Sequence, residues 1–97
     1  MSNYTRRINQ PAVTPANTIA VPIGAVPALS AAIPADSVRL CGTSACYVTF
    51  GAAPVASAAS MYLPADAAEI FQFVPGELVS VLQLGGGGGT LYITWGN

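Results

Sequence analysis

The sequence contains no histidine and no lysine, and it holds few charged residues of any kind. Three arginines and four acids make up 7% of its 97 residues, whereas roughly 25% is usual in soluble domains. The absence of histidine excludes histidine-based catalytic triads and histidine-ligated metal sites. Three arginines are too few to neutralise the phosphates of a nucleic acid. We therefore expect no enzymatic activity, no cofactor, no metal and no nucleic-acid partner, and a structural or binding protein instead.

Apolar residues dominate the chain: 53% of it is hydrophobic, with ten glycines and eight prolines besides. A chain of this length fits one small domain. Because few charges cover its surface, much of that surface must consist of small and apolar groups, and large exposed apolar patches usually mark interaction sites. We predict a homo-oligomer with closed cyclic symmetry, and we favour a trimer.

Proline interrupts the first part of the chain at short intervals. Since proline fixes φ and pushes the preceding residue towards extended geometry, no helix fits residues 1–36. We predict an extended, proline-rich N-terminal arm over residues 1–17, followed by a β domain over residues 18–97. The arm carries side chains suited to contact a partner protein: Tyr4, Arg6, Arg7 and Ile8.

Residues 19–35 form an apolar stretch that follows Arg6 and Arg7, as the core of an export signal would. The stretch contains three prolines, each of which removes a backbone donor and breaks a helical turn. A spanning helix needs about 20 apolar residues with a satisfied backbone, so we expect no membrane span. A cleaved export leader is the alternative.

After residue 36 the pattern becomes strand-like, with apolar residues at every second position. This period of two is typical of half-buried strands, and short strands separated by turns predict an all-β fold, a small β-sandwich or a jelly roll. The run 78–84 is apolar on both faces and should be central in a sheet. Residues 52–60 are alanine-rich and fit a short helix by propensity, although Pro54 and the serines favour a loop or weak strand. The segments predicted as strands are 18–21, 29–33, 38–41, 46–50, 69–74, 78–84 and 90–95.

One turn motif recurs at residues 33–36, 63–66 and 74–77: an apolar residue, proline, a small residue and an acid. Proline presets the second turn position, a small residue fits the third, and the acid can accept hydrogen bonds from nearby backbone N–H groups. The motif holds Asp36, Asp66 and Glu77, three of the four acids. This structural role argues against a paired-carboxylate mechanism.

Two further features predict hairpins. The five glycines 85–89 lie between two predicted strands and indicate a flexible hairpin tip, which could order against a partner at Gly87. Cys41 and Cys46 flank the turn-like sequence Gly-Thr-Ser-Ala and should lie on neighbouring hairpin strands. We interpret both as small buried residues, with a disulfide between them as the alternative.

Several of these segments resemble a known family. The segments are Val48-Thr-Phe-Gly51-Ala-Ala-Pro54-Val-Ala, Leu63-Pro-Ala-Asp66, Phe73-Val-Pro-Gly-Glu77, and a glycine-rich tip before Leu91-Tyr-Ile-Thr94. Together, residues 36–95 resemble small β-sandwich structural proteins of tailed bacteriophages. The resemblance implies a virion protein, most plausibly a capsid decoration or cement protein that binds the outer capsid face and bridges neighbouring capsomers. It implies no catalytic residues.

We therefore expect a protein assembled in the host cytoplasm that binds the major capsid protein and stiffens the shell against the pressure of packaged DNA. Its contacts should come from Tyr4, Arg6, Arg7 and Ile8 of the arm, and to a lesser degree from Gly87 and Trp95. Two alternatives are a tail, neck or fibre component and a secreted surface- or carbohydrate-binding module.

Overall fold

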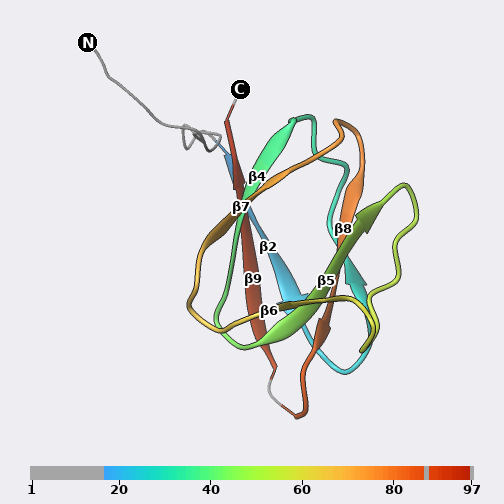
Figure 1. Ribbon diagram of the computed structural model, residues 1–97, viewed down its shortest axis with the longest axis vertical. Helices are drawn as coiled ribbons and strands as arrows, with labels where there is room; N and C mark the ends of the chain where they lie inside the picture. Colours follow the sequence, from blue (N-terminus) through green and yellow to red (C-terminus); the bar gives the residue numbers. More distant parts are fainter. Residues whose placement is uncertain (1–16, 87, 97) are drawn as a thin grey trace.

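The computed structural model of the chain describes residues 17–86 and 88–96, which form eight β-strands and no helix (Figure 1). The strands make two four-stranded sheets that pack on one another, in the orders β2-β9-β4-β7 and β3-β8-β5-β6. The all-β prediction is confirmed, and the architecture is a small β-sandwich. The strands are β2 (Asn17–Ile23), β3 (Ala28–Leu29), β4 (Ser37–Gly42), β5 (Cys46–Gly51), β6 (Met61–Leu63), β7 (Glu69–Gln72), β8 (Leu78–Gln83) and β9 (Gly89–Trp95).

The strand pairing is nested and antiparallel throughout. β2 pairs with β9, β3 with β8, β4 with β7 and β5 with β6. The first described strand thus pairs with the last, the second with the second-last, and so on inwards. Eight strands nested in this way across two sheets form a jelly roll, one of the two predicted architectures. As a consequence, every connection except β5–β6 crosses from one sheet to the other.

Both hairpin predictions are wrong for this reason. The glycine run joins β8 to β9, and the residues between Cys41 and Cys46 join β4 to β5, and in each case the two strands lie in different sheets. Turn residues do not determine whether the next strand pairs with the last or crosses the sandwich. Both cysteines are free thiols, so the structure shows no disulfide; Cys46 is buried in the core as predicted, and Cys41 is half-buried.

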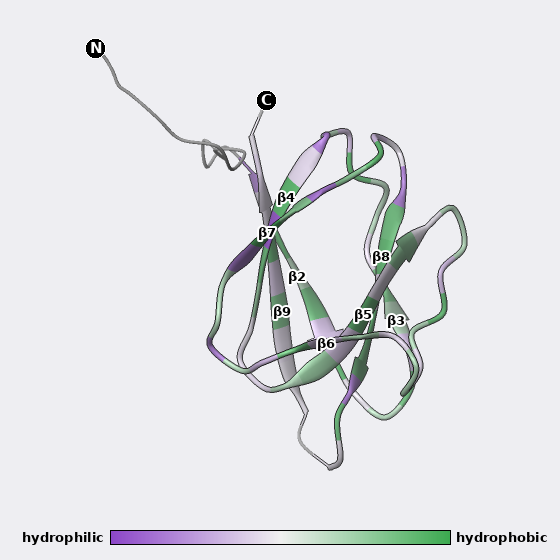
Figure 2. Cartoon of the chain, viewed as in Figure 1, coloured by the Kyte–Doolittle hydropathy of each residue, from purple (hydrophilic) through white to green (hydrophobic). Residues whose placement is uncertain are grey.

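The core follows the predicted alternation. On β4, Val38 and Leu40 are fully buried between the sheets while Arg39 points to solvent. On β9, the side chains of Leu91 and Ile93 face the same core. Figure 2 shows β8 as hydrophobic over most of its length. This agrees with its interior place between β3 and β5.

Segment 52–60 is a loop rather than a helix, and it explains why β8 is buried on both faces. Val79 and Val81 face the core, so Ser80 between them points to the outer face of the sheet, yet Ser80 is also fully buried. The backbone N–H of Ala56 donates a hydrogen bond to Ser80 Oγ (2.9 Å), which ties the loop over this position.

The proline turns 33–36 and 74–77 lie at one end of the sandwich, and the turn 63–66 lies at the other end, beside Gly42. In the turn 74–77 the Glu77 N–H donates to the Val74 carbonyl (3.1 Å) and Gly76 has φ 94°, as a type II turn requires. The expected role of the acids is not observed. In the part of the chain that the structure describes, no carboxylate of these turns accepts a hydrogen bond from a backbone N–H.

Candidate interaction surface

The charged side chains are distributed unevenly between the two sheets. None of those that the structure describes lies on a strand of the β3-β8-β5-β6 sheet. They are found on β4, on β7 and in the turns: Asp36, Arg39, Asp66, Glu69 and Glu77. Figure 2 shows the strands of the β3-β8-β5-β6 sheet as hydrophobic or pale over most of their length.

The outer face of this sheet carries apolar and aromatic side chains in register. Tyr47 of β5 pairs with Leu82 of β8 on one side and with Tyr62 of β6 on the other. Residues paired across strands share a face, so the three side chains form a continuous row. Leu29 of β3, paired with Ser80, extends the same face. We call Leu29, Tyr47, Tyr62 and Leu82 the uncharged face.

Two of these four side chains remain largely open to solvent. Tyr62 is 52% exposed and Leu29 is 55% exposed, while Tyr47 and Leu82 are half-buried. Val55 of the adjoining loop adds another exposed apolar side chain. Exposed apolar groups gathered on an uncharged surface are typical of a protein–protein contact.

The outer face of the β2-β9-β4-β7 sheet is more polar. Its central row includes Thr18 and Thr94, whose hydroxyl oxygens lie 3.1 Å apart in a hydrogen bond, followed by Arg39 opposite Thr94. Tyr92, 44% exposed, is the large aromatic residue of this face. This contrast makes the uncharged face the better candidate for burial against a partner.

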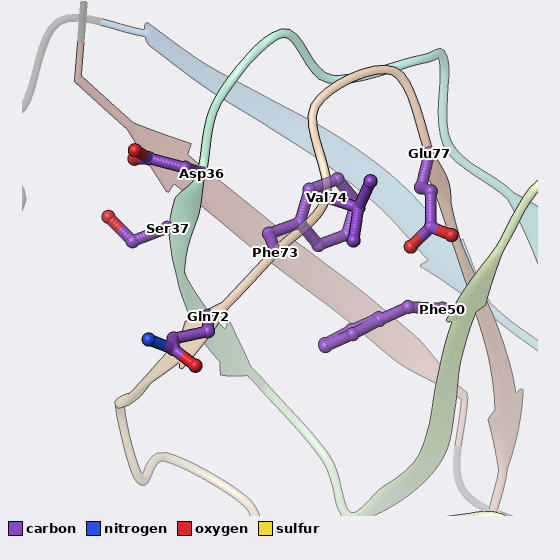
Figure 3. A pocket seen from close by; sticks show the side chains of 7 residues that line it. All are labelled: Asp36, Ser37, Phe50, Gln72, Phe73, Val74 and Glu77. Carbon is purple, nitrogen blue, oxygen red and sulfur yellow. The ribbon is translucent and has the colours of Figure 1, made fainter.

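A second feature is an open pocket of about 540 Å³ at the end of the sandwich where β4 begins and β7 ends (Figure 3). Phe50 and Phe73 contact each other edge-to-face in its wall, with ring centroids 5.1 Å apart. In Figure 3 the Glu77 side chain points towards Phe50, and Asp36 lies on the opposite side. The full lining is Asp36, Ser37, Phe50, Gln72, Phe73, Val74 and Glu77.

Of the residues predicted as contacts, Tyr4, Arg6, Arg7, Ile8 and Gly87 lie outside the described residues. Trp95 is half-buried, packs against the core and pairs with Asn17 across β9 and β2.

The described glycines on either side of position 87 and Trp95 lie at opposite ends of β9. Gly86 and Gly88 precede β9 and Trp95 ends it, which separates them by about 20 Å. Of the six predicted contact residues the structure describes Trp95 alone, so their grouping into one site stays a prediction.

Sequence reasoning missed the uncharged face and the pocket. The strand segments 46–51, 61–63 and 78–83 contain no charged residue, which was the available signal. It could not be used without knowing that these three strands share a sheet.

The described residues contain no group of three potential metal-ligating side chains. Burial raises the pKa of the Cys46 thiol, which keeps it protonated and unreactive. In residues 17–86 and 88–96 there is also no helix of the length and apolarity that crossing a bilayer demands.

Comparison with family models, with curated proteins and with solved structures gave no match for this chain.

Proposed function

We propose that the chain is a bacteriophage virion structural protein, a decoration or cement protein that binds the outer capsid surface and bridges subunits of the major capsid protein. The observation that carries this proposal is the uncharged face, where Leu29 and Tyr62 are more than half exposed. Covering such a surface with a partner lowers the free energy, because apolar groups are removed from water.

The fold is compatible with this role. Jelly rolls of eight strands occur in viral capsid proteins and in lectins. This support is an analogy at the level of the fold, because one fold hosts many functions. The resemblance of residues 36–95 to phage β-sandwich proteins adds to it.

This mode of capsid binding requires no covalent step. Each copy buries apolar and backbone surface across a boundary between capsid subunits, and about 800 Å² per partner suffices for a stable contact. Because many copies bind one shell, modest individual affinities add up to a large resistance against expansion. The low charge of the chain keeps the desolvation cost of these contacts small.

The test is the location of the protein in assembled particles. Particles purified from the host that carries this sequence are analysed by mass spectrometry and by cryo-electron microscopy. The proposal predicts many copies of the chain per particle, with density for the sandwich on the outer capsid surface. Density on a tail, neck or fibre would support the structural alternative and overturn the decoration role, and absence from the particles would overturn both.

The pocket favours a second candidate, a secreted carbohydrate-binding module. Its lining combines carboxylates and an amide with an aromatic ring, groups that bind sugar hydroxyls and pack against sugar rings: Asp36, Gln72, Glu77 and Phe50. This candidate predicts binding in a glycan array. A cleaved leader of about 30 residues does not fit the fold, because β2 and β3 belong to the sandwich.

A further inference from the structure

The chain segregates its charges between the arm and the sandwich. The described residues hold all four acids and one arginine, a formal charge of −3. Residues 1–16 hold Arg6 and Arg7 and no acid, a formal charge of +2, which together give the −1 of the whole chain. The two parts are therefore complementary in sign.

The pocket gathers two of the four acids and no basic residue. Asp36 and Glu77 come from two of the recurring proline turns, which are adjacent at one end of the sandwich (the upper end in Figure 1). Backbone hydrogen bonds connect the turns and the end of β7. Gly76 N–H donates to the Ile33 carbonyl (2.8 Å), Ile33 N–H to the Glu77 carbonyl (3.0 Å) and Phe73 N–H to the Asp36 carbonyl (2.8 Å). The backbone that carries the two acids is thus fixed. In Figure 3 the Glu77 carboxylate is directed towards Phe50, whereas the Asp36 carboxylate points away from the two rings.

This lining suits an arginine-bearing segment. A guanidinium group binds carboxylates with paired hydrogen bonds and packs its plane on aromatic rings, here the half-buried Phe50. In an extended segment, successive side chains point to opposite sides, so Arg6 and Arg7 can reach two acids that lie on opposite sides of the pocket, as Asp36 and Glu77 do in Figure 3. The pocket volume of about 540 Å³ lies within the range of about 300–1,000 Å³ of ligand pockets.

β2, which follows the arm, starts at the end of the sandwich where the pocket opens. Asn17 pairs with Trp95, and Thr18, Thr94 and Arg39 form one row, so β2 starts at the end where β4 starts and the pocket opens. β2 and β7 are opposite edges of their sheet, which puts the pocket about 15 Å away across three strand spacings.

The reach of the arm favours a neighbouring molecule over its own. Tyr4 to Ile8 precede Asn17 by nine to thirteen residues, or about 30–43 Å of extended chain. Pro11 and Pro15 lie in between and disfavour folding back. An arm that is extended, as its prolines predict, would overshoot the pocket of its own molecule.

We propose that the pocket of one copy binds the N-terminal segment Tyr4–Ile8 of a second copy, with Arg6 and Arg7 paired to Asp36 and Glu77. A head-to-tail exchange of this kind forms a ring when the rotation between copies closes, and closure after three copies would give the trimer. The inference goes beyond the proposed function and develops the homo-oligomer predicted from the sequence. Its test uses the purified chain alone, so capsid attachment can fail while arm exchange holds, and the reverse.

The first experiment neutralises the pocket in the full-length chain. In sedimentation equilibrium, Asp36→Asn with Glu77→Gln should raise the dissociation constant of the assembly about tenfold or more, because two charge-assisted contacts are lost. The matched control, Asp66→Asn with Glu69→Gln, changes the net charge equally at exposed acids outside the pocket. Asn tolerates the positive φ of position 66. The control should assemble as the wild type does, and an equal effect of both variants would overturn the proposal.

The second experiment exchanges the charges. A chain with Arg6→Glu and Arg7→Glu and a chain with Asp36→Arg and Glu77→Arg should each lose assembly while keeping the β circular-dichroism spectrum. Mixing the two should restore association as one-to-one complexes, because the acidic arm of one meets the basic pocket of the other and the basic arm meets the acidic pocket; a ring of three is not expected, since two of its members would be alike. Failure of the folded mixture to assemble would overturn the proposal. So would a monomeric wild type with its arm in its own pocket, or sugar binding at the pocket with assembly unchanged in the pocket variants.

Discussion

Replacing Tyr62 with lysine tests whether the uncharged face, proposed above to bind the capsid, also contributes to self-association of the chain. Tyr62 lies on β6, an edge strand of three residues, and points outwards beside Tyr47. Lysine is well tolerated on edge strands. We therefore expect the fold to be retained, with a loss of less than about 1 kcal/mol in the free energy of unfolding from the Tyr47–Tyr62 pair.

The effect on assembly follows from the exposed area. A tyrosine buries about 150–250 Å² when fully covered, and Tyr62 is 52% exposed, so about 100 Å² remains for a partner to cover. At about 25 cal/mol per Å² this area is worth at most about 2.5 kcal/mol. Tyr62→Lys should therefore weaken the assembly by between about tenfold and about 70-fold.

The assay is sedimentation equilibrium over a concentration series, with Tyr92→Lys as the matched control. Tyr92 is 44% exposed on the outer face of the other sheet, so the two variants remove the same side chain from two different faces. The dissociation constant should rise for Tyr62→Lys and stay within about twofold of wild type for Tyr92→Lys. An unchanged constant for Tyr62→Lys, or equal effects of the two variants, would refute this use of the uncharged face.

Three predictions concern stability and reactivity. Ser80→Ala should lower the free energy of unfolding in urea by about 1–3 kcal/mol, because the Ala56 N–H loses its buried acceptor; the exposed Ser57→Ala should change it by less than about 0.5 kcal/mol. Gly89→Ala should cost about 1–2 kcal/mol in the same assay, since a Cβ there meets Thr43 Oγ1 at 2.5 Å, whereas Gly86→Ala meets nothing within 4 Å and should be neutral. Because burial raises the pKa of Cys46, that thiol should resist iodoacetamide in the folded chain. For the same reason the free energy of unfolding should fall as pH rises above about 8.5, where the thiol loses its proton in the unfolded chain first. Equal alkylation rates in folded and unfolded protein, or a pH slope that Cys46→Ala leaves unchanged, would contradict this.

The sequence predicts the strands better than their arrangement. Alternation located β4, β5 and β9, and the apolar run 78–84 correctly indicated an interior strand. Such patterns report which face of each strand is buried. They do not report which strand lies beside it, because a turn such as 85–89 serves a hairpin and a crossover equally well.

The candidate surfaces depend on that missing information. Tyr47, Tyr62 and Leu82 form a row only through pairing between β5, β6 and β8. Asp36 and Glu77 lie 41 positions apart in the sequence and line one pocket because the nested pairing places their turns together. Local motifs identified the turns, and only the long-range topology shows that two of them are neighbours.

Sedimentation equilibrium of the wild-type chain in dilute buffer, from about 1 to 100 µM, tests whether a chain with so few charges buries its apolar surface against other copies. We expect a mass of at least twice 9.8 kDa, with three copies favoured. A single species of 9.8 kDa across the whole concentration range would contradict it.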